Sequence, residues 1–176
     1  MTQPAKRVAI LATDGFEESE LVEPRKRLLD AGFAVDVVSP APGEIRGWKD
    51  KDWGDSVGVD VVLSQANHQD YDALVLPGGV INPDKLRAEV AAVDFVRAFD
   101  HAGKPVAAIC HGPWMLAEAG VAKGRNVTSY QSIRTDMENA GGQWQDEEVV
   151  QDGHVITSRK PDDIPAFTDA VIQALR

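Results

Sequence analysis

The chain has 176 residues, of which 43% are hydrophobic and 26% are charged, a composition ordinary for one folded domain spanning residues 1–176. Its formal net charge of −10 argues against a dedicated nucleic-acid surface, because such surfaces depend on clustered Lys and Arg. No apolar run reaches the roughly 20 residues that span a bilayer, and the start of the chain lacks a signal-peptide pattern. We therefore expect a cytoplasmic protein without a membrane partner.

Apolar runs alternate with segments of helical periodicity along the whole chain. Strands are expected at residues 7–13, 34–39, 73–79, 106–109, 127–129, 148–150 and 154–158, and helices at residues 18–31, 83–102, 114–119, 133–140 and 163–175. This alternation predicts an α/β fold with a doubly wound, mostly parallel sheet.

Two features of the first sixty residues modify this pattern. Pro24 lies inside the first helix and predicts a kinked or two-part helix whose first turn, with Glu20, is set apart from the rest. Residues 41–60 are rich in Gly, Asp and Trp and predict a surface hairpin. Its Trp48 and Trp53 either pin the hairpin or contact another subunit.

Cys110, the only cysteine, lies where an apolar strand meets the start of a helix with almost no turn between them. Such a turn holds its central residue in a strained conformation and needs small neighbours, which Ala108 and Gly112 provide. The first amides of the helix would lower the pKa of the Cys110 thiol. The spacing predicts a cysteine nucleophile, and the alternative is a small buried apolar residue.

Other groups follow strands at the same edge of the sheet, where doubly wound folds bind ligands. The amides of Gly78 and Gly79 could receive an oxyanion together with the amide of His111, or the glycines could form an ordinary turn. Glu20 is the first candidate, and Glu17 the second, for a carboxyl beside Cys110. Loss of solvation and repulsion by the thiolate would raise the pKa of that carboxyl.

Other polar residues favour structural roles. His154 lies in an alternating strand and His68 in a polar loop, and both are better explained as structural residues. His111 need not activate its neighbour Cys110 and could face another subunit. The spacing of histidines and carboxylates predicts no metal site, and no glycine-rich phosphate loop is present.

Five segments together resemble the PfpI-type intracellular proteases, in the superfamily that includes the Parkinsonism-associated deglycase. They are GFEESEL at 15–21, ALVLPGG at 73–79, AICHGP at 108–113, TSY at 128–130 and VITSR at 155–159. The resemblance covers nearly the whole chain. It implies a flavodoxin-like sandwich with helices on both faces of the sheet, and homodimers or larger rings with a pocket at the subunit interface.

The resemblance also implies roles for individual residues. The nucleophile falls on Cys110, the adjacent histidine on His111 and the pocket glutamate on Glu20. In protease-like members, an acid shortly after Pro-Gly-Gly reaches the histidine from a neighbouring subunit, and here that acid is Asp84. Tyr130 falls on a residue of the pocket wall.

Three functions are consistent with these residues. The first is a cofactor-free stress-response enzyme that acts on reactive dicarbonyls or their protein adducts through a hemithioacetal at Cys110. The second is a peptidase that uses Cys110, His111 and Asp84 across a subunit interface. The third is an oxidation-responsive stress protein or chaperone, in which Glu20 stabilises oxidised Cys110. The related glutaminases carry a later His-Pro-Glu segment, which this chain lacks, so glutamine hydrolysis is rejected.

Overall fold

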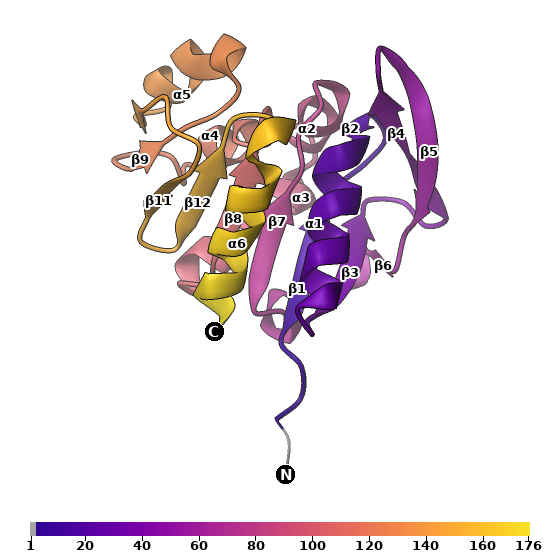
Figure 1. The fold of residues 1–176 in the computed structure, drawn as a ribbon. Coiled ribbons are helices and arrows are strands. Elements are labelled where there is room, and N and C mark those ends of the chain that lie inside the picture. The colour runs from indigo at the N-terminus through magenta and orange to yellow at the C-terminus, as the bar shows by residue number, and fades with distance from the viewer. Residues whose placement is uncertain (1–2) are drawn as a thin grey trace.

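A computed structural model describes residues 3–176, which form a central seven-stranded sheet with helices on both faces (Figure 1). The strands of this sheet are β1 (Arg7–Leu11), β3 (Ala34–Ser39), β6 (Val61–Val62), β7 (Ala73–Leu76), β8 (Val106–Ile109), β11 (Val150–Asp152) and β12 (Val155–Ser158). Their order is β11-β12-β8-β7-β1-β3-β6, and β11 alone pairs antiparallel. The predicted doubly wound, mostly parallel sheet is confirmed.

Six α-helices of the described chain surround this sheet. They are α1 (Glu18–Asp30), α2 (Ile81–Leu86), α3 (Val90–His101), α4 (Trp114–Glu118), α5 (Arg134–Asn139) and α6 (Ile164–Leu175). α1 and α6 pack side by side on one face of the sheet (Figure 1). Val8 and Ile10 of β1 belong to the core between these two helices and the sheet. The intervening Ala9 and Leu11 point to the opposite core with α3, because side chains alternate along a strand. None of these helices is long and apolar enough to cross a membrane.

Short elements lie at the edges of the main sheet. They are β2 (Phe16–Glu17), β4 (Glu44–Lys49), β5 (Asp52–Gly58), β9 (Asn126–Val127), β10 (Gln143–Trp144), and the 3-10 turns η1 (Leu63–Gln65), η2 (His68–Asp70), η3 (Gln131–Ile133) and η4 (Pro161–Asp163). β4 and β5 form the predicted hairpin, which turns at Asp50 and Lys51 with φ angles of 49° and 69°. β2 pairs with β4, so the hairpin is joined to the segment that leads into α1.

Two helices differ from the sequence-based expectation. α1 is one continuous helix with Pro24 inside it, so the two-part alternative is wrong. Proline removes a single helical hydrogen bond, to the carbonyl of Glu20, and burial of Pro24 against the core holds the remaining turns together. The single helix expected at 83–102 is two helices, α2 and α3, because Glu89 is extended. This break lets α2 and α3 reach the same core along different axes.

The ends of β1, β7 and β8 meet at one edge of the sheet because these strands are parallel neighbours. The segments that follow them carry Glu17 and Glu20, then Gly78 and Gly79, then Cys110 and His111. The topology therefore brings three separate segments of the sequence to one place.

Candidate active site

Cys110 forms a tight elbow between β8 and α4. Its φ angle is 64°, in the left-handed region that non-glycine residues seldom occupy. The Cys110 amide donates to the carbonyl of Ser158 at 3.1 Å, and the Tyr130 amide donates to the Cys110 carbonyl at 2.8 Å. A Cβ atom at Gly112 would lie 2.4 Å from the carbonyl oxygen of Leu76, so only glycine fits there. These contacts fix the strained backbone at Cys110.

Cys110 is 7% exposed. Some of the groups around its sulfur stabilise the thiolate, and others destabilise it. The amides of Gly79 and His111 donate to the sulfur and favour the thiolate. Burial, followed by the nearby charge of Glu20, nevertheless raises the pKa of the Cys110 thiol well above its usual value. The prediction of a lowered pKa at Cys110 is wrong, because desolvation outweighs the amide dipoles.

Glu20, from the first turn of α1, is fully buried beside this thiol. Its Oε1 accepts a hydrogen bond from the Gly78 amide at 3.0 Å, while Oε2 is buried without a hydrogen-bond partner. The carboxyl also interacts with the Cys110 thiol. Burial, and then the charge of Glu17, raise the pKa of Glu20 to about 8. The predicted upward shift is confirmed, and the carboxyl is mainly protonated at neutral pH.

Gly78 and Gly79 have different partners at the site. The Gly79 amide faces the Cys110 sulfur, whereas the Gly78 amide is engaged by Glu20. Gly79 has a φ angle of 81°, and a Cβ atom there would lie 2.4 Å from the carbonyl oxygen of Gly15. The amides available to a developing oxyanion are therefore those of Gly79 and His111, and Gly78 positions the carboxyl instead.

The His111 ring is fixed on both edges and one face. Nδ1 lies 3.3 Å from the Cys110 sulfur and Nε2 lies 3.4 Å from the Ser132 hydroxyl. The ring stacks on Tyr130, with centroids 4.9 Å apart. Burial lowers the pKa of His111, so the imidazole is mainly neutral at neutral pH.

A cavity of about 500 Å³ opens above the thiol. Its walls include Glu17, Glu20, Gly79, Cys110, His111 and Tyr130 of the predicted site, together with Gly15, Trp48, Val80, Ile81, Ser132 and Pro161. Trp48, Ser132 and Pro161 are cavity residues that local sequence does not predict. Trp48 stands out in the sequence as a hairpin aromatic, but the pairing of β2 with β4 that brings it to the cavity has no local signal.

Asn82 supports the site from behind and was also not predicted. It is fully buried, and its Nδ2 donates to the carbonyls of Pro77 and Gly78, at 3.1 Å each. Its Oδ1 accepts from the Thr13 amide at 2.8 Å. One side chain thus joins the turns that follow β1 and β7.

Asp84 lies apart from the thiol within the chain. It is exposed on α2 and borders a separate cavity with Thr13 and Pro40. Contact between Asp84 and His111 would therefore require a second subunit. Glu17 is half-buried at the cavity, where burial and the charges of Asp50 and Glu18 raise its pKa.

The other two histidines singled out in the sequence lie away from this cavity. His154 Nε2 is 2.7 Å from Asp100, and His68 packs edge-on against Phe99, as expected of structural residues. Within residues 3–176, no three His, Cys, Asp or Glu side chains are grouped as metal ligands would be.

The chain also matches a known protein family over almost its whole length. Residues 6–174 match the DJ-1/PfpI family. The chain belongs to that family. General stress protein 18 of Bacillus subtilis is 46% identical over 164 residues, covering 92% of this chain and 93% of the relative. Deglycase PfpI of Pyrococcus furiosus is 43% identical over 170 residues, covering 97% of this chain and 99% of the relative.

A solved DJ-1/PfpI structure has the same fold. It is a two-domain protein from Anabaena variabilis with DJ-1/ThiJ/PfpI-like and ferritin-like domains, 38% identical, with a TM-score of 0.92. The match covers 97% of this chain but 48% of that longer one. The fold and the family expected from the sequence are thus confirmed.

Proposed function

We propose that this DJ-1/PfpI protein is a cysteine-dependent stress-response enzyme that acts on reactive dicarbonyls or on the adducts they leave on proteins. The observation that carries the proposal is the buried pair of Cys110 and Glu20, a thiol and a carboxyl in contact beside a cavity of about 500 Å³. The relatives named deglycase and general stress protein support the same class of reaction and the same setting.

The proposed reaction begins with addition of the thiol to an aldehyde. The Cys110 sulfur bonds to the aldehyde carbon, and the thiol proton passes through the Glu20 carboxyl to the carbonyl oxygen, giving a hemithioacetal. The amides of Gly79 and His111, which face the sulfur, stabilise negative charge on that oxygen. For an adduct, the amine or thiol of the damaged residue takes up the proton and leaves as the sulfur bonds to the same carbon.

Glu20 then moves a proton between the two substrate carbons. As a carboxylate it removes the hydrogen on the carbon bonded to sulfur, and the bond electrons form an enediol. The same carboxyl returns the proton to the neighbouring carbon, which gives a thioester. Water cleaves this thioester, releasing lactate from methylglyoxal and restoring the thiol.

The test is conversion of methylglyoxal to lactate without glutathione. We expect Cys110→Ala to abolish turnover and Glu20→Gln to lower kcat by at least about 100-fold, the usual scale of acid–base catalysis. Glu23→Gln is the matched control, since Glu23 is exposed on the same helix. Absence of turnover in the wild-type protein would contradict the proposal.

The pH dependence of kcat/KM provides a second test. The proton-moving step needs ionised Glu20, and the pKa of this carboxyl in the free protein is about 8. We expect kcat/KM to rise about tenfold per pH unit on the acid side and to level off near pH 8. A profile already flat at pH 5 to 7 would show that Glu20 is not the base.

A peptidase is the second candidate, and it depends on a subunit interface. In the described chain, His111 Nε2 faces Ser132, and Asp84 borders another cavity. If Asp84 reaches His111 from a second subunit, mixing inactive Cys110→Ala subunits with inactive Asp84→Ala subunits should restore peptide cleavage. In the mixed oligomer, one subunit supplies Cys110 and the other supplies Asp84. Failure of such mixing, with both variants folded, would remove this candidate.

We further propose that the chain forms homodimers or larger homo-oligomers in the cytoplasm. Val80 and Tyr130 are 56% and 41% exposed at the cavity that holds Cys110. Exposed apolar side chains beside a cavity suit an interface that covers its mouth.

A further inference from the structure

A second cavity, of about 650 Å³, adjoins the active-site cavity. Tyr130 and Ser132 line both cavities, so a ligand that leaves the thiol along these residues enters the second one. Its walls carry hydroxyl, amide and charged groups, whereas the first cavity is mainly apolar. Methylglyoxal is much smaller than the first cavity alone, so the second cavity suits a larger substrate.

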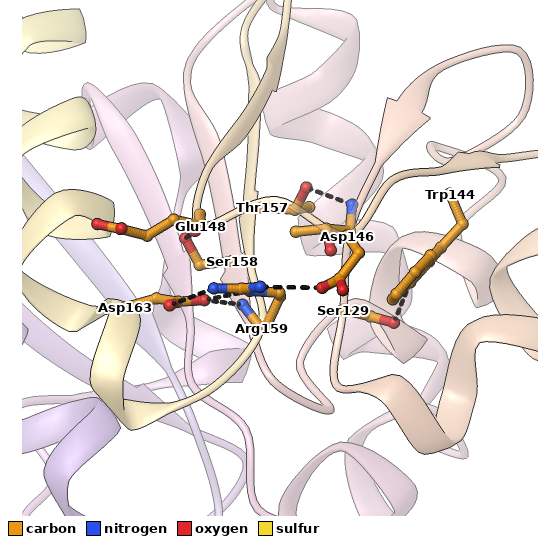
Figure 2. A network of polar contacts seen from close by, with 9 residues as sticks. Ser129, Trp144, Asp146, Glu148, Thr157, Ser158, Arg159 and Asp163 are labelled. Atoms are coloured by element: carbon orange, nitrogen blue, oxygen red, sulfur yellow. Dashed lines mark hydrogen bonds and ion pairs between the residues drawn. The ribbon is translucent and has the colours of Figure 1, made fainter.

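Arg159 is held in this second cavity by hydrogen bonds to two carboxylates. Its Nε and Nη2 donate to the two carboxylate oxygens of Asp163 at 3.0 and 3.1 Å, and its amide donates to the same carboxylate at 2.9 Å (Figure 2). Asp163 is almost fully buried, with 3% of its side chain exposed. The guanidinium is therefore fixed in one orientation by a partner that cannot easily move.

The remaining nitrogen of Arg159 has a different kind of partner. Nη1 donates to Asp146 at 2.9 Å, on the side of the guanidinium away from Asp163 (Figure 2). The Asp146 side chain is 72% exposed, so its carboxylate can return to water at little cost. Asp146 thus shows that a carboxylate fits this nitrogen, and that the one now present is replaceable.

A second cation lies at the same cavity. Lys160 lines it together with Arg159. The guanidinium of Arg134, 4.8 Å from the ring centroid of the wall residue Trp144, is paired with Glu138 and is not counted among the lining cations. Arg159 and Lys160 are therefore the two cations that a ligand in this cavity would meet.

We propose that Arg159 and Lys160 form a subsite for a carboxylate group carried by the substrate, with Asp146 as its intramolecular competitor. The proposal extends the proposed deglycase function, because it identifies the substrate as an adduct attached to a carboxylate-bearing amino acid or peptide. The carboxylate can come from a chain terminus or from an acidic side chain, and both offer Arg159 Nη1 the same two oxygens.

The test is a binding titration followed by 1H–15N NMR, which does not depend on catalysis. The reporters are the Arg159 Nε–H and the Trp144 indole N–H, which donates to Ser129 beside the cavity. Acetylglycine represents a terminal carboxylate, the α-amide of acetylaspartic acid represents a side-chain carboxylate, and acetylglycinamide is the uncharged control. We expect saturable shifts with one or both acids and none with the amide, and the stronger acid identifies the source.

Two pairs of variants sharpen the result. Asp146→Asn removes the competitor and should lower the Kd of the preferred acid about threefold, while Asp162→Asn makes the same charge change at an exposed neighbour outside the cavity and should not. Lys160→Gln should raise the Kd about threefold to tenfold, and Lys123→Gln, at another exposed lysine, should leave it unchanged. Arg159 itself is not replaced, because its loss would leave buried Asp163 unpaired.

The outcomes separate this subsite from the proposed reaction. Equal shifts with acid and amide, no shifts, or equal effects of Asp146→Asn and Asp162→Asn would overturn the subsite, whatever the activity toward methylglyoxal. If binding is as expected and methylglyoxal is not consumed, the subsite stands and the proposed reaction fails. In an active enzyme, KM for a methylglyoxal adduct of acetylcysteine should be lower than for the adduct of its amide, with kcat unchanged.

Discussion

Glu20 and Cys110 each make the charged form of the other less favourable. Burial is the main cause of both raised pKa values, and the two groups lie close enough that ionising both would place two negative charges in one apolar pocket. The site therefore keeps its protons at rest and releases them only when a substrate accepts one.

Titration of Glu20 should make the folded protein less stable as pH rises. Its folded pKa, about 8, exceeds the ordinary 4.5, so between these values the folded chain holds a proton that the unfolded chain has lost. Glu20→Gln should gain stability relative to wild type by up to about 1.4 kcal/mol per pH unit across that window. Chemical denaturation from pH 5 to 8 measures this, with Glu23→Gln as the control. Parallel wild-type and Glu20→Gln curves would contradict the assignment.

Asn82 should contribute strongly to stability through three hydrogen bonds made by one buried side chain. Asn82→Ala leaves a buried amide and two carbonyls without that partner, so we expect a loss of about 2–4 kcal/mol in the free energy of unfolding. Activity should fall as well, because the turn that carries Gly79 is released. Asn139→Ala, at an exposed asparagine, should change neither quantity measurably.

Local sequence was sufficient for the centre of the site and insufficient for its walls. Cys110 and Glu20 could be singled out because a strand, a tight turn and a helix start are all encoded within a few residues. Trp48, Ser132 and Asn82 depend on pairings between distant segments, which no short pattern contains. The pKa of Cys110 was misjudged for a related reason, since helix amides are visible in the sequence and burial is not.

At the scale of elements, the elbow depends on close approach between two turns. The Gly112 backbone lies so near the end of β7 that an added Cβ atom would meet the Leu76 carbonyl at 2.4 Å and the Ile109 carbonyl at 2.9 Å. Both obstacles are backbone atoms, which cannot rotate away. The elbow and β7 must therefore move together.

Gly112→Ala should destabilise the protein by at least about 2 kcal/mol, because backbone must shift to admit the methyl group. Gly58→Ala is the matched control, since nothing lies within 4 Å of a Cβ atom there and its φ is not positive. Thermal unfolding compares the two variants. A Gly112→Ala melting temperature equal to that of Gly58→Ala would show that the close approach does not constrain the elbow.

The order of elements was easier to predict than their boundaries. The alternation of strand and helix patterns gave the parallel sheet, and β4 and β5 formed where Gly, Asp and Trp were concentrated. The division of α2 from α3 was missed because apolar spacing continues across Glu89, although the backbone there is extended. Apolar periodicity records which residues are buried and does not record a change of helix axis.

At the scale of the whole molecule, the proposed oligomer should cover the cavity mouth. Light scattering should give a mass that is a multiple of 19.0 kDa. Val80→Glu places a charge at the mouth and should lower that mass, whereas Val90→Glu, at a valine that is 75% exposed on α3, should not. A monomeric wild-type protein would refute the oligomer, and with it any role for Asp84 at His111.

The single buried thiol also allows opening of the active-site cavity to be followed by alkylation of Cys110. Cys110 is 7% exposed and is the only cysteine, so every alkylation event requires a reagent to reach this one cavity. Relative to its rate with the unfolded chain at the same pH, labelling should be slowed more for bulky maleimides than for small iodoacetamide, and the difference between the two reagents reports how often the cavity walls separate. Mass spectrometry of the labelled protein would thus measure the rate at which the cavity opens, without any attached probe.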